Sequence, residues 1–237
     1  MPAPIVKAID NLNEALCDLK FGKSVFCTYN PLEYAFNAHL HFLKKYGAGS
    51  KRVLFLGMNP GPYGMVQTGI PFGEISMVRD WMGIELEITP PETVHPKRPV
   101  IGFHCQKSEV SGQRFWSMMA SQFESPENFF ASNMVVNYCP LVWMTESGKN
   151  ITPDKLPSSV MKPVYKACDE YFVSMLDYYQ PEVLVGVGAF AEKQLRRMVG
   201  EESYQIGRML HPSPASPIAN KHWPQRALED LAELGVL

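Results

Sequence analysis

The sequence contains few charges and no long apolar run. Only 19% of its 237 residues are charged, and the formal net charge is −2, so the total charge does not indicate a polyanionic partner. No apolar segment has the length of a membrane span, and the N-terminus lacks the charged-then-apolar pattern of a signal peptide. We therefore expect a soluble intracellular protein without membrane contact.

Several common catalytic and metal-binding motifs are also missing. The five cysteines include no CxxC pair, which excludes the usual zinc and iron-sulfur spacings and favours reduced thiols. The chain has no GxSxG, HExxH or Walker A motif. His39 and His41 alternate in "AHLHF", but two histidines alone do not define a metal site. We predict neither metal nor cofactor.

Acidic residues are absent from three windows, 34–73, 93–108 and 203–228. Together these windows hold ten of the 22 Lys and Arg residues and none of the 24 acids. If the windows meet in space, they would form one positive face suited to phosphates. The alternative is a set of scattered, solvated lysines.

The apolar residues predict one α/β domain over residues 1–237. Hydrophobic residues make up 46% of the chain, enough for a large core. Short, continuously apolar strands are expected at 53–57, 133–138, 183–188 and about 206–210, with helices at 5–20, 75–83, 111–123, 161–179, 189–200 and 226–235. This alternation favours a largely parallel central sheet with helices on both faces, and the Pro-rich stretch 89–99 is expected to be ordered.

The segment "GVGAFA" at 186–191 fits the glycine pattern of a dinucleotide fold. No acidic residue stands at the expected distance in a following strand. We interpret Gly186 and Gly188 as a tight turn between a strand and a helix.

The loop "GMNPGPYGMVQTGIPFGE" at 57–74 is the most unusual segment, with five glycines and three prolines. Proline fixes φ while glycine permits conformations closed to other residues, so the loop is both sharply bent and rigid. Taken alone, the tripeptide N-P-G is typical of an ordinary turn packed on the core. Asn59, which can donate and accept, and Phe72, which can present a flat face, favour a binding role.

Two further polar residues stand at expected strand ends. Asn137 in "VVNYCP" carries an amide that must be paired, either by the protein or by a ligand. His211 and Ser213 lie on the proline-rich segment "HPSPASP" at 211–217. In parallel α/β sheets, ligands bind where strands end. Asn137 and His211 could each also have a structural role.

Taken in order, the segments "LFLGMNPGPYGMVQTGIPFGEISMVRDWMGI", "TPPETVHPKRPV", "SEVSGQRFW", "NYCPL", "LVGVGAFAE" and "HPSP" resemble the single-strand-selective monofunctional uracil-DNA glycosylases. The resemblance covers nearly the whole chain. It implies the α/β/α sandwich of the uracil-DNA glycosylase superfamily, with a four-stranded, mainly parallel sheet. It also implies a base-excision repair enzyme that removes uracil, and oxidised derivatives such as 5-hydroxymethyluracil, from DNA.

The resemblance also implies roles for the singled-out residues. Asn137 reads the base edge, and Phe72 stacks beneath the flipped base. His211 donates to uracil O2 as charge develops there, and Asn59 positions the attacking water. The backbone around Met58 and Gly61 lines the pocket on the C5 side of the base.

Asn59 stands where other branches of the superfamily carry an aspartate. An amide cannot act as a general base, so we expect a largely dissociative reaction in which water captures a cationic sugar. No lysine is required as a nucleophile. The product would be an abasic site, without strand cleavage.

The segment after His211 is expected to contact DNA through Ser213, Pro214, Ala215, Ser216 and Lys221. Animal members carry Arg-Asn as a wedge where this chain has Ala215 and Ser216. A smaller, uncharged wedge predicts greater dependence on single strands or weak mismatches. Lys221 and Arg226 are expected to be available for phosphates.

Two alternatives remain open. A glycosylase for deaminated purines would meet the same acceptor-donor edge at Asn137, and an inert damage-binding module could share the fold. The expected partner is DNA, single- or double-stranded and containing uracil, and we expect a monomer. It would lie in the cytoplasm of a bacterium or the nucleus of a eukaryote.

Overall fold

The computed structural model describes residues 2–200 and 203–237, built around a four-stranded sheet in the order β3–β2–β6–β7. The strands are β2 (Val53–Gly57), β3 (Asn133–Asn137), β6 (Val183–Val187) and β7 (Gln205–Met209). Each neighbouring pair is parallel. The predicted central sheet is confirmed, and its four strands are all parallel.

The burial of the strands follows their sequences. β2, β3 and β6 are buried at every position, as their unbroken apolar runs predict. β7 lies at the edge, and Gln205 and Arg208 on it are exposed. The core of the molecule therefore lies on both faces of the three other strands.

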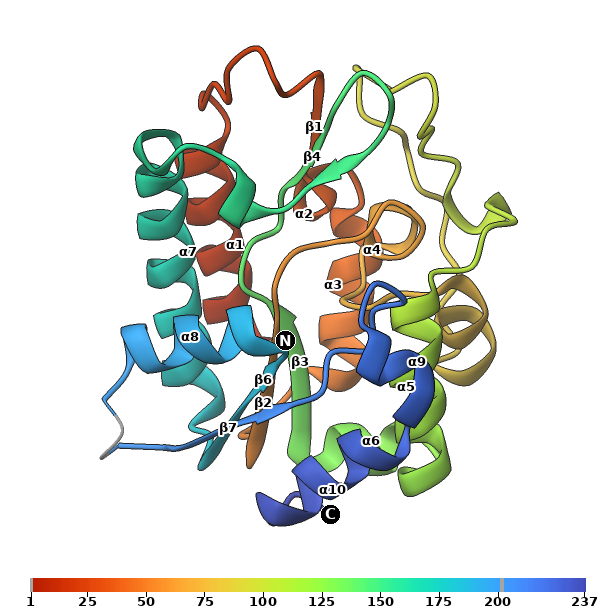
Figure 1. Ribbon diagram of the computed structural model, residues 1–237, viewed down its shortest axis with the longest axis vertical. Helices are drawn as coiled ribbons and strands as arrows, with labels where there is room; N and C mark the ends of the chain where they lie inside the picture. The colour runs from red at the N-terminus through yellow and green to blue at the C-terminus, as the bar shows by residue number, and fades with distance from the viewer. Residues whose placement is uncertain (1, 201–202) are drawn as a thin grey trace.

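Helices cover both faces of this sheet. α1 (Ala3–Leu16), α7 (Ser158–Tyr179) and α8 (Ala189–Met198) lie on one side, and α3 (Phe36–Tyr46) and α5 (Val110–Phe123) lie on the other (Figure 1). α1 packs along α7, and α8 packs on β6. The result is the predicted α/β/α sandwich. No helix in the described part of the chain is both long and apolar enough to cross a bilayer.

Several short elements were not predicted. They are the helices α2 (Pro31–Tyr34), α4 (Met65–Thr68), α6 (Pro126–Ser132), α9 (Pro217–His222) and the 3-10 turns η2 (Gly102–His104) and η3 (Pro153–Lys155). The C-terminal helix α10 (Gln225–Glu233) was expected. The predicted helix at 75–83 is confirmed over 75–81, although it is mostly π-helical: residues 75–76 are α-helical, and η1 (Met77–Trp81) continues from them.

A second, antiparallel sheet was also missed. It joins β1 (Cys27–Tyr29), β4 (Val142–Met144) and β5 (Asn150–Ile151) in the order β1–β4–β5. Strands of two or three residues are too short for apolar periodicity to reveal them. The long helix α3 was overlooked as well, although its buried residues have helical spacing.

The Pro-rich stretch 89–99 is ordered, as expected, but without regular structure. The Tyr29 hydroxyl accepts from the backbone N–H of His95 and donates to the carbonyl of Arg98, both at 2.7 Å. The His95 ring donates from Nε2 to the carbonyl of Thr145 at 3.0 Å. These bonds hold the excursion against the small sheet.

Candidate active site

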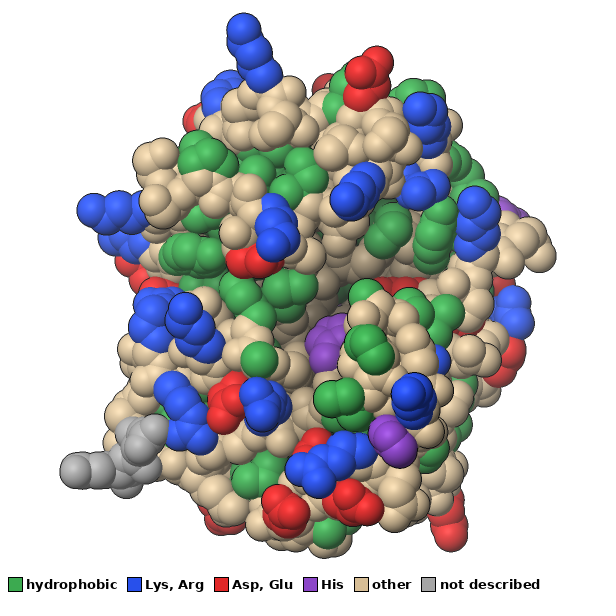
Figure 2. Space-filling model, in the orientation of Figure 1, with side chains coloured by type: hydrophobic (Ala, Val, Ile, Leu, Met, Phe, Trp, Pro, Cys, Tyr) green, Lys and Arg blue, Asp and Glu red, His purple; other side chains and the backbone are tan. Residues whose placement is uncertain are grey.

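The loops that follow β2, β3 and β7 emerge at one end of the sheet, because the carboxyl ends of parallel strands share an edge. The loops after β2 and β7 carry Asn59 and His211, and Asn137 is the last residue of β3. Figure 2 shows a hollow near the centre of this face, with a histidine at its border and Lys and Arg side chains around it. This edge is the candidate active site.

The floor of the site is aromatic. Phe72 stacks on Phe115 of α5, with ring centroids 4.8 Å apart and an interplanar angle of 16°. The backbone beside Phe72 is fixed because Trp116 Nε1 donates to the carbonyl of Pro71 at 3.3 Å. Phe72 itself has a φ of 52°, a conformation rare for a bulky residue. Such strain at a ring on the site edge is typical of a functional position.

Asn137 stands at the end of β3, with only 8% of its surface exposed. A Cβ atom on Gly57 would overlap both the Asn137 Oδ1 atom and the Phe72 ring. Gly57 therefore allows the amide and the ring to meet. The Asn137 Nδ2 atom donates to the sulfur of Met65 at 3.2 Å.

Asn59 is oriented by a backbone carbonyl. Its Nδ2 atom donates to the carbonyl of Leu141 at 3.0 Å. Since a carbonyl only accepts, this bond identifies which end of the amide is nitrogen. Oδ1 is left as an acceptor on the other side of the group.

His211 is held in one tautomer. The backbone N–H of Ser213 donates to Nδ1 at 3.0 Å, so the neutral ring carries its hydrogen on Nε2. Burial lowers the pKa of His211 to about 4, and the ring is therefore neutral at physiological pH. Its centroid lies 6.3 Å from that of Phe72. The site thus contains a neutral N–H donor beside its aromatic floor.

The turn after β6 makes room for this histidine. A Cβ on Gly188, whose φ is 88°, would come within 2.9 Å of the His211 Cβ atom, and one on Gly186 would overlap the backbone of Glu192. The interpretation of "GVGAFA" as a tight turn is confirmed. Its glycines serve packing against α8 and His211.

The segment 211–217 is internally braced. The Ser213 hydroxyl accepts from the N–H of Ala215 at 3.1 Å, and the Ser216 hydroxyl caps α9 by accepting from the N–H of Ala219 at 3.2 Å. Arg114 of α5 donates to the carbonyl of Pro212 at 3.2 Å. The segment is thus held as a rigid tongue beside the floor.

Comparison with known proteins places this geometry in a family. The profile of the uracil DNA glycosylase superfamily matches residues 44–232. The chain belongs to the uracil-DNA glycosylase superfamily.

Three similar relatives within this superfamily are mammalian. Single-strand selective monofunctional uracil DNA glycosylases of Bos taurus, Rattus norvegicus and Mus musculus are 46%, 44% and 43% identical to it. Each alignment spans 95% of this chain, with 84% of the bovine protein and 82% of each rodent protein. The crystal structure of the wild-type SMUG2 protein of Pedobacter heparinus has the same fold, with a TM-score of 0.62 at 19% identity over 96% of this chain and 94% of that one.

The structure of this superfamily member brings most of the predicted site residues to one edge. Phe72 lies near His211, and Asn137 and Phe72 both lie against Gly57, while Met58, Asn59 and Gly61 lie on the loop between β2 and α4. Pro214, Ala215 and Lys221 are exposed on the tongue and α9, whereas the hydroxyls of Ser213 and Ser216 are engaged internally.

The expectation that Arg226 is available for phosphates stays a prediction. This side chain pairs with Asp230 at 3.0 Å and lies 3.6 Å from Glu229, on its own helix. Its charge is therefore largely compensated within α10. Acidic residues just beyond the acid-free window supply the partners.

A buried acid, Glu109, was not singled out in the sequence. Its carboxyl occupies the space that a Cβ on Gly61 or Gly64 would take, and its Oε2 atom is buried without a hydrogen-bond partner among the described residues. Burial, and then the charge of Glu74, raises the pKa of Glu109 to about 7. Glu74 has a structural role, because its carboxylate accepts from the Ser76 hydroxyl at 2.6 Å. The only sequence signal for Glu109 was its place in "SEVSGQRFW".

Two of the acid-free windows do meet in space. Tyr63, on the loop of the first window, has Arg98 and Lys107 of the second at its ring, 5.3 and 5.1 Å from the centroid. The Lys107 Nζ atom also donates to the Tyr63 hydroxyl at 3.4 Å. We call Tyr63, Arg98 and Lys107 the cationic lip.

Proposed function

We propose that this chain is a monofunctional DNA glycosylase of base excision repair that hydrolyses the N-glycosidic bond of uracil. We extend the proposal to oxidised derivatives such as 5-hydroxymethyluracil, in single- and double-stranded DNA. The observation that carries it is a nearly buried amide, Asn137, beside an aromatic floor and a neutral imidazole N–H. The activity for which the mammalian relatives are named supports the same conclusion.

Recognition of the base follows from the edge that it presents. A glycosylase extrudes its target nucleotide and reads the Watson-Crick edge in a pocket. An amide at Asn137 donates to O4 of uracil and accepts from N3–H. Cytosine would present a donor to the donor and an acceptor to the acceptor, at a cost of about 1–3 kcal/mol for each unpaired buried group. Phe72 would stack under the base, a contact worth about 1–3 kcal/mol.

His211 would stabilise the departing base. As the glycosidic bond breaks, the bonding electrons move to the base and negative charge grows on O2. The Nε2–H donor, fixed by the bond to Nδ1, strengthens its interaction as that charge develops. Because the ring is neutral, it donates a hydrogen bond without first transferring a proton.

Asn59 would place the water. Oδ1 accepts one hydrogen of the water while Nδ2 stays on the carbonyl of Leu141. The amide cannot remove a proton, so the water adds to a sugar that already carries positive charge. The water proton then leaves to solvent or to the base anion, and the products are an abasic site and free uracil.

The DNA would lie across the face of the hollow. The cationic lip would line one side of the DNA path, and the tongue with the exposed Lys221 would line the other. Cations on both sides suit a phosphate backbone. We further propose that residues 1–237 act as one domain and as a monomer, in the compartment that holds the DNA, which is the cytoplasm of a bacterium or the nucleus of a eukaryote.

The test is release of uracil from labelled oligonucleotides in EDTA, followed by alkaline cleavage of abasic sites. Uracil is offered in single strands, opposite guanine and opposite adenine, with a hypoxanthine oligonucleotide in parallel. We expect cleavage at uracil, fastest in single strands and slowest opposite adenine. Absence of cleavage at uracil would reject the activity, and preferential cleavage at hypoxanthine would favour the purine alternative.

Asn59→Ala tests the role of the water in the same assay. We expect uracil release to fall about tenfold to a hundredfold, because the nucleophile loses its position. Asn128→Ala, at an exposed asparagine on α6, is the matched control and should keep the wild-type rate. Equal rates in Asn59→Ala and the control would contradict the assignment.

A further inference from the structure

The proposed reading of uracil requires the Asn137 amide to hold one orientation. Base pairing uses Oδ1 and the amide hydrogen on the same side as Oδ1. The second amide hydrogen points away from the base, into the protein. A rotation of 180° exchanges nitrogen and oxygen and makes the amide complementary to cytosine. Something behind Asn137 must therefore distinguish the two ends of the group.

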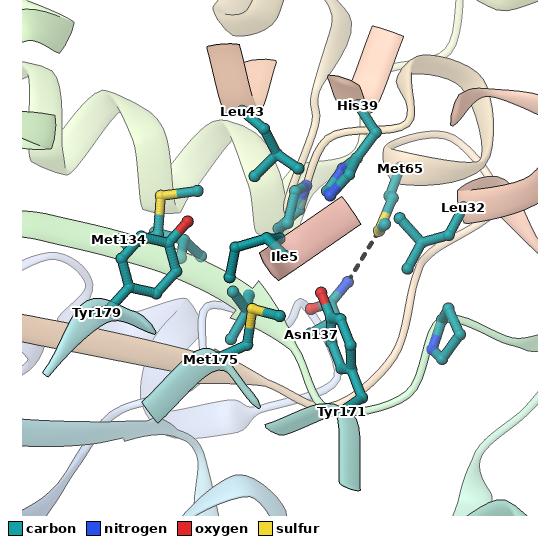
Figure 3. Close-up of a pocket in the computed structure, with 14 residues that line it drawn as sticks. Ile5, Leu32, His39, Leu43, Met65, Met134, Asn137, Tyr171, Met175 and Tyr179 are labelled. Atoms are coloured by element: carbon teal, nitrogen blue, oxygen red, sulfur yellow. Dashed lines mark hydrogen bonds between the residues drawn. The ribbon is translucent and has the colours of Figure 1, made fainter. Parts of the chain in front are cut away.

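Met65 is the residue in contact with that inner side. It begins α4 and is only 2% exposed. The Asn137 Nδ2 atom donates to its sulfur at 3.2 Å, and Figure 3 shows the two side chains pointing toward one another. A thioether sulfur accepts hydrogen bonds and has no hydrogen to donate. In the rotated amide, Oδ1 would face the sulfur with lone pairs on both atoms.

Three other polar side chains line the cavity beside this contact. Asn137 and Met65 border a buried cavity of about 10 Å³ that is also lined by His39. His39 donates from Nδ1 to the carbonyl of Gly69 at 2.8 Å, which leaves Nε2 as an acceptor. Burial lowers the pKa of His39 to about 4, so the ring keeps this acceptor at neutral pH. The hydroxyls of Tyr171 and Tyr179, also on the cavity, can donate or accept and so impose no choice.

We propose that Met65 is a positioning residue for base selection, whose sulfur accepts the inner N–H of Asn137 and thereby holds the amide in the orientation complementary to uracil. The inference rests on the proposed function. It adds a residue that acts through Asn137 and that lies 72 positions from it in the sequence.

The contact is weak, and this sets the expected size of the effect. A neutral hydrogen bond contributes about 0.5–1.5 kcal/mol, and sulfur is a poor acceptor. Removing the sulfur should therefore change the preference between bases by about threefold to tenfold. It should leave the capacity to cleave the glycosidic bond in place, because Asn59 and His211 are untouched.

The experiment compares Met65→Leu with Met175→Leu. Met175 lines the same cavity and is 1% exposed, so the same substitution there alters packing without removing the partner of Asn137. Affinities are measured for single strands carrying 2′-fluoro-deoxyuridine or 2′-fluoro-deoxycytidine, whose glycosidic bonds resist hydrolysis. We expect the ratio of the two affinities to fall about threefold to tenfold in Met65→Leu and to stay at the wild-type value in Met175→Leu.

Melting temperatures and uracil release accompany these affinities. A purely structural role for Met65 would lower stability in both variants and leave the affinity ratio unchanged, which would overturn the proposal. Should Met65→Leu fail to fold, Met65→Ile removes the same acceptor and is read in the same way. Wild-type protein that releases no uracil would reject the proposed function itself. Wild-type protein that releases uracil, with an unchanged ratio in the variants, would reject only the role of Met65.

Discussion

The two polar groups proposed to contact uracil are oriented in different ways. His211 is fixed from within its own segment, because the N–H of Ser213, two residues away, donates to Nδ1. Asn137 is fixed by the sulfur of Met65, on a different element. The tongue is thus a self-contained unit that carries the leaving-group donor. The amide side is assembled from the ends of β2 and β3 and from α4.

This difference separates catalysis from selection. The tongue presents the His211 donor, whose tautomer is set by a hydrogen bond from the nearby backbone. Small movements elsewhere in the protein should therefore leave this donor in place. The orientation of the amide depends on packing between distant segments. We therefore expect changes at the tongue to alter the rate of bond breaking, and changes behind Asn137 to alter the choice of base.

The largest expected effect is on the tongue side. His211→Ala removes the donor to the developing charge on O2, and loss of one such donor typically lowers a rate constant about a hundredfold to a thousandfold. Single-turnover release of uracil at saturating enzyme measures this step. Affinity for uncleavable substrate should change much less, because the interaction strengthens only as the bond breaks.

Ser213→Ala is the matched control on the tongue. The backbone N–H that orients His211 remains, and only the hydroxyl that accepts from Ala215 is lost. We expect the single-turnover rate to stay within about threefold of wild type, since one exposed turn contact is removed. A loss as large as that of His211→Ala would show that the tautomer depends on more than the local bond.

The next largest effect is on the free energy of unfolding, and it comes from one histidine near each region. These are His39, which lines the same cavity as Asn137, and His211 on the tongue. Burial lowers the folded-state pKa of both His39 and His211 to about 4, against about 6.5 in an unfolded chain. Between these values the unfolded state binds more protons, so the free energy of unfolding rises with pH. Stability from this source is complete above about pH 6.5 and is lost as pH falls toward 4, by on the order of 3 kcal/mol for the fully buried His39. His211 should contribute less, because it is partly exposed.

Urea unfolding between pH 7.5 and 4.5 measures this dependence. His39→Gln removes the titrating group, and its free energy of unfolding should vary less with pH than that of wild type. His211→Gln provides the comparison from the tongue and should flatten the curve to a smaller degree. Parallel curves for wild type and His39→Gln would contradict the prediction.

The same difference between regions explains what the sequence could predict. The central strands were located because their apolar runs are continuous, and the local spacing in "HPSP" and "GMNPGPYG" drew attention to His211 and Asn59. Met65 could not be found in this way, since its role depends on a contact with Asn137 that only the folded sheet creates. Glu109 was missed for the same reason, because its burial against Gly61 and Gly64 is a property of packing. Very short strands such as β1 and β5 lack a periodicity long enough to recognise.

The smallest expected effect concerns the DNA strand rather than the base. The cationic lip belongs to the loop side of the site, whereas Lys221 on α9 belongs to the tongue side. If each lysine contacts one phosphate, Lys107→Ala and Lys221→Ala should each reduce the slope of log K against log salt by about 0.7 on single strands and 0.9 on duplexes. Lys166→Ala, on α7 and paired with Glu170, is the control and should leave the slope unchanged. A reduced slope in only one of the two variants would show that a single side of the hollow holds the backbone, and an unchanged slope in both would remove these lysines from the DNA path.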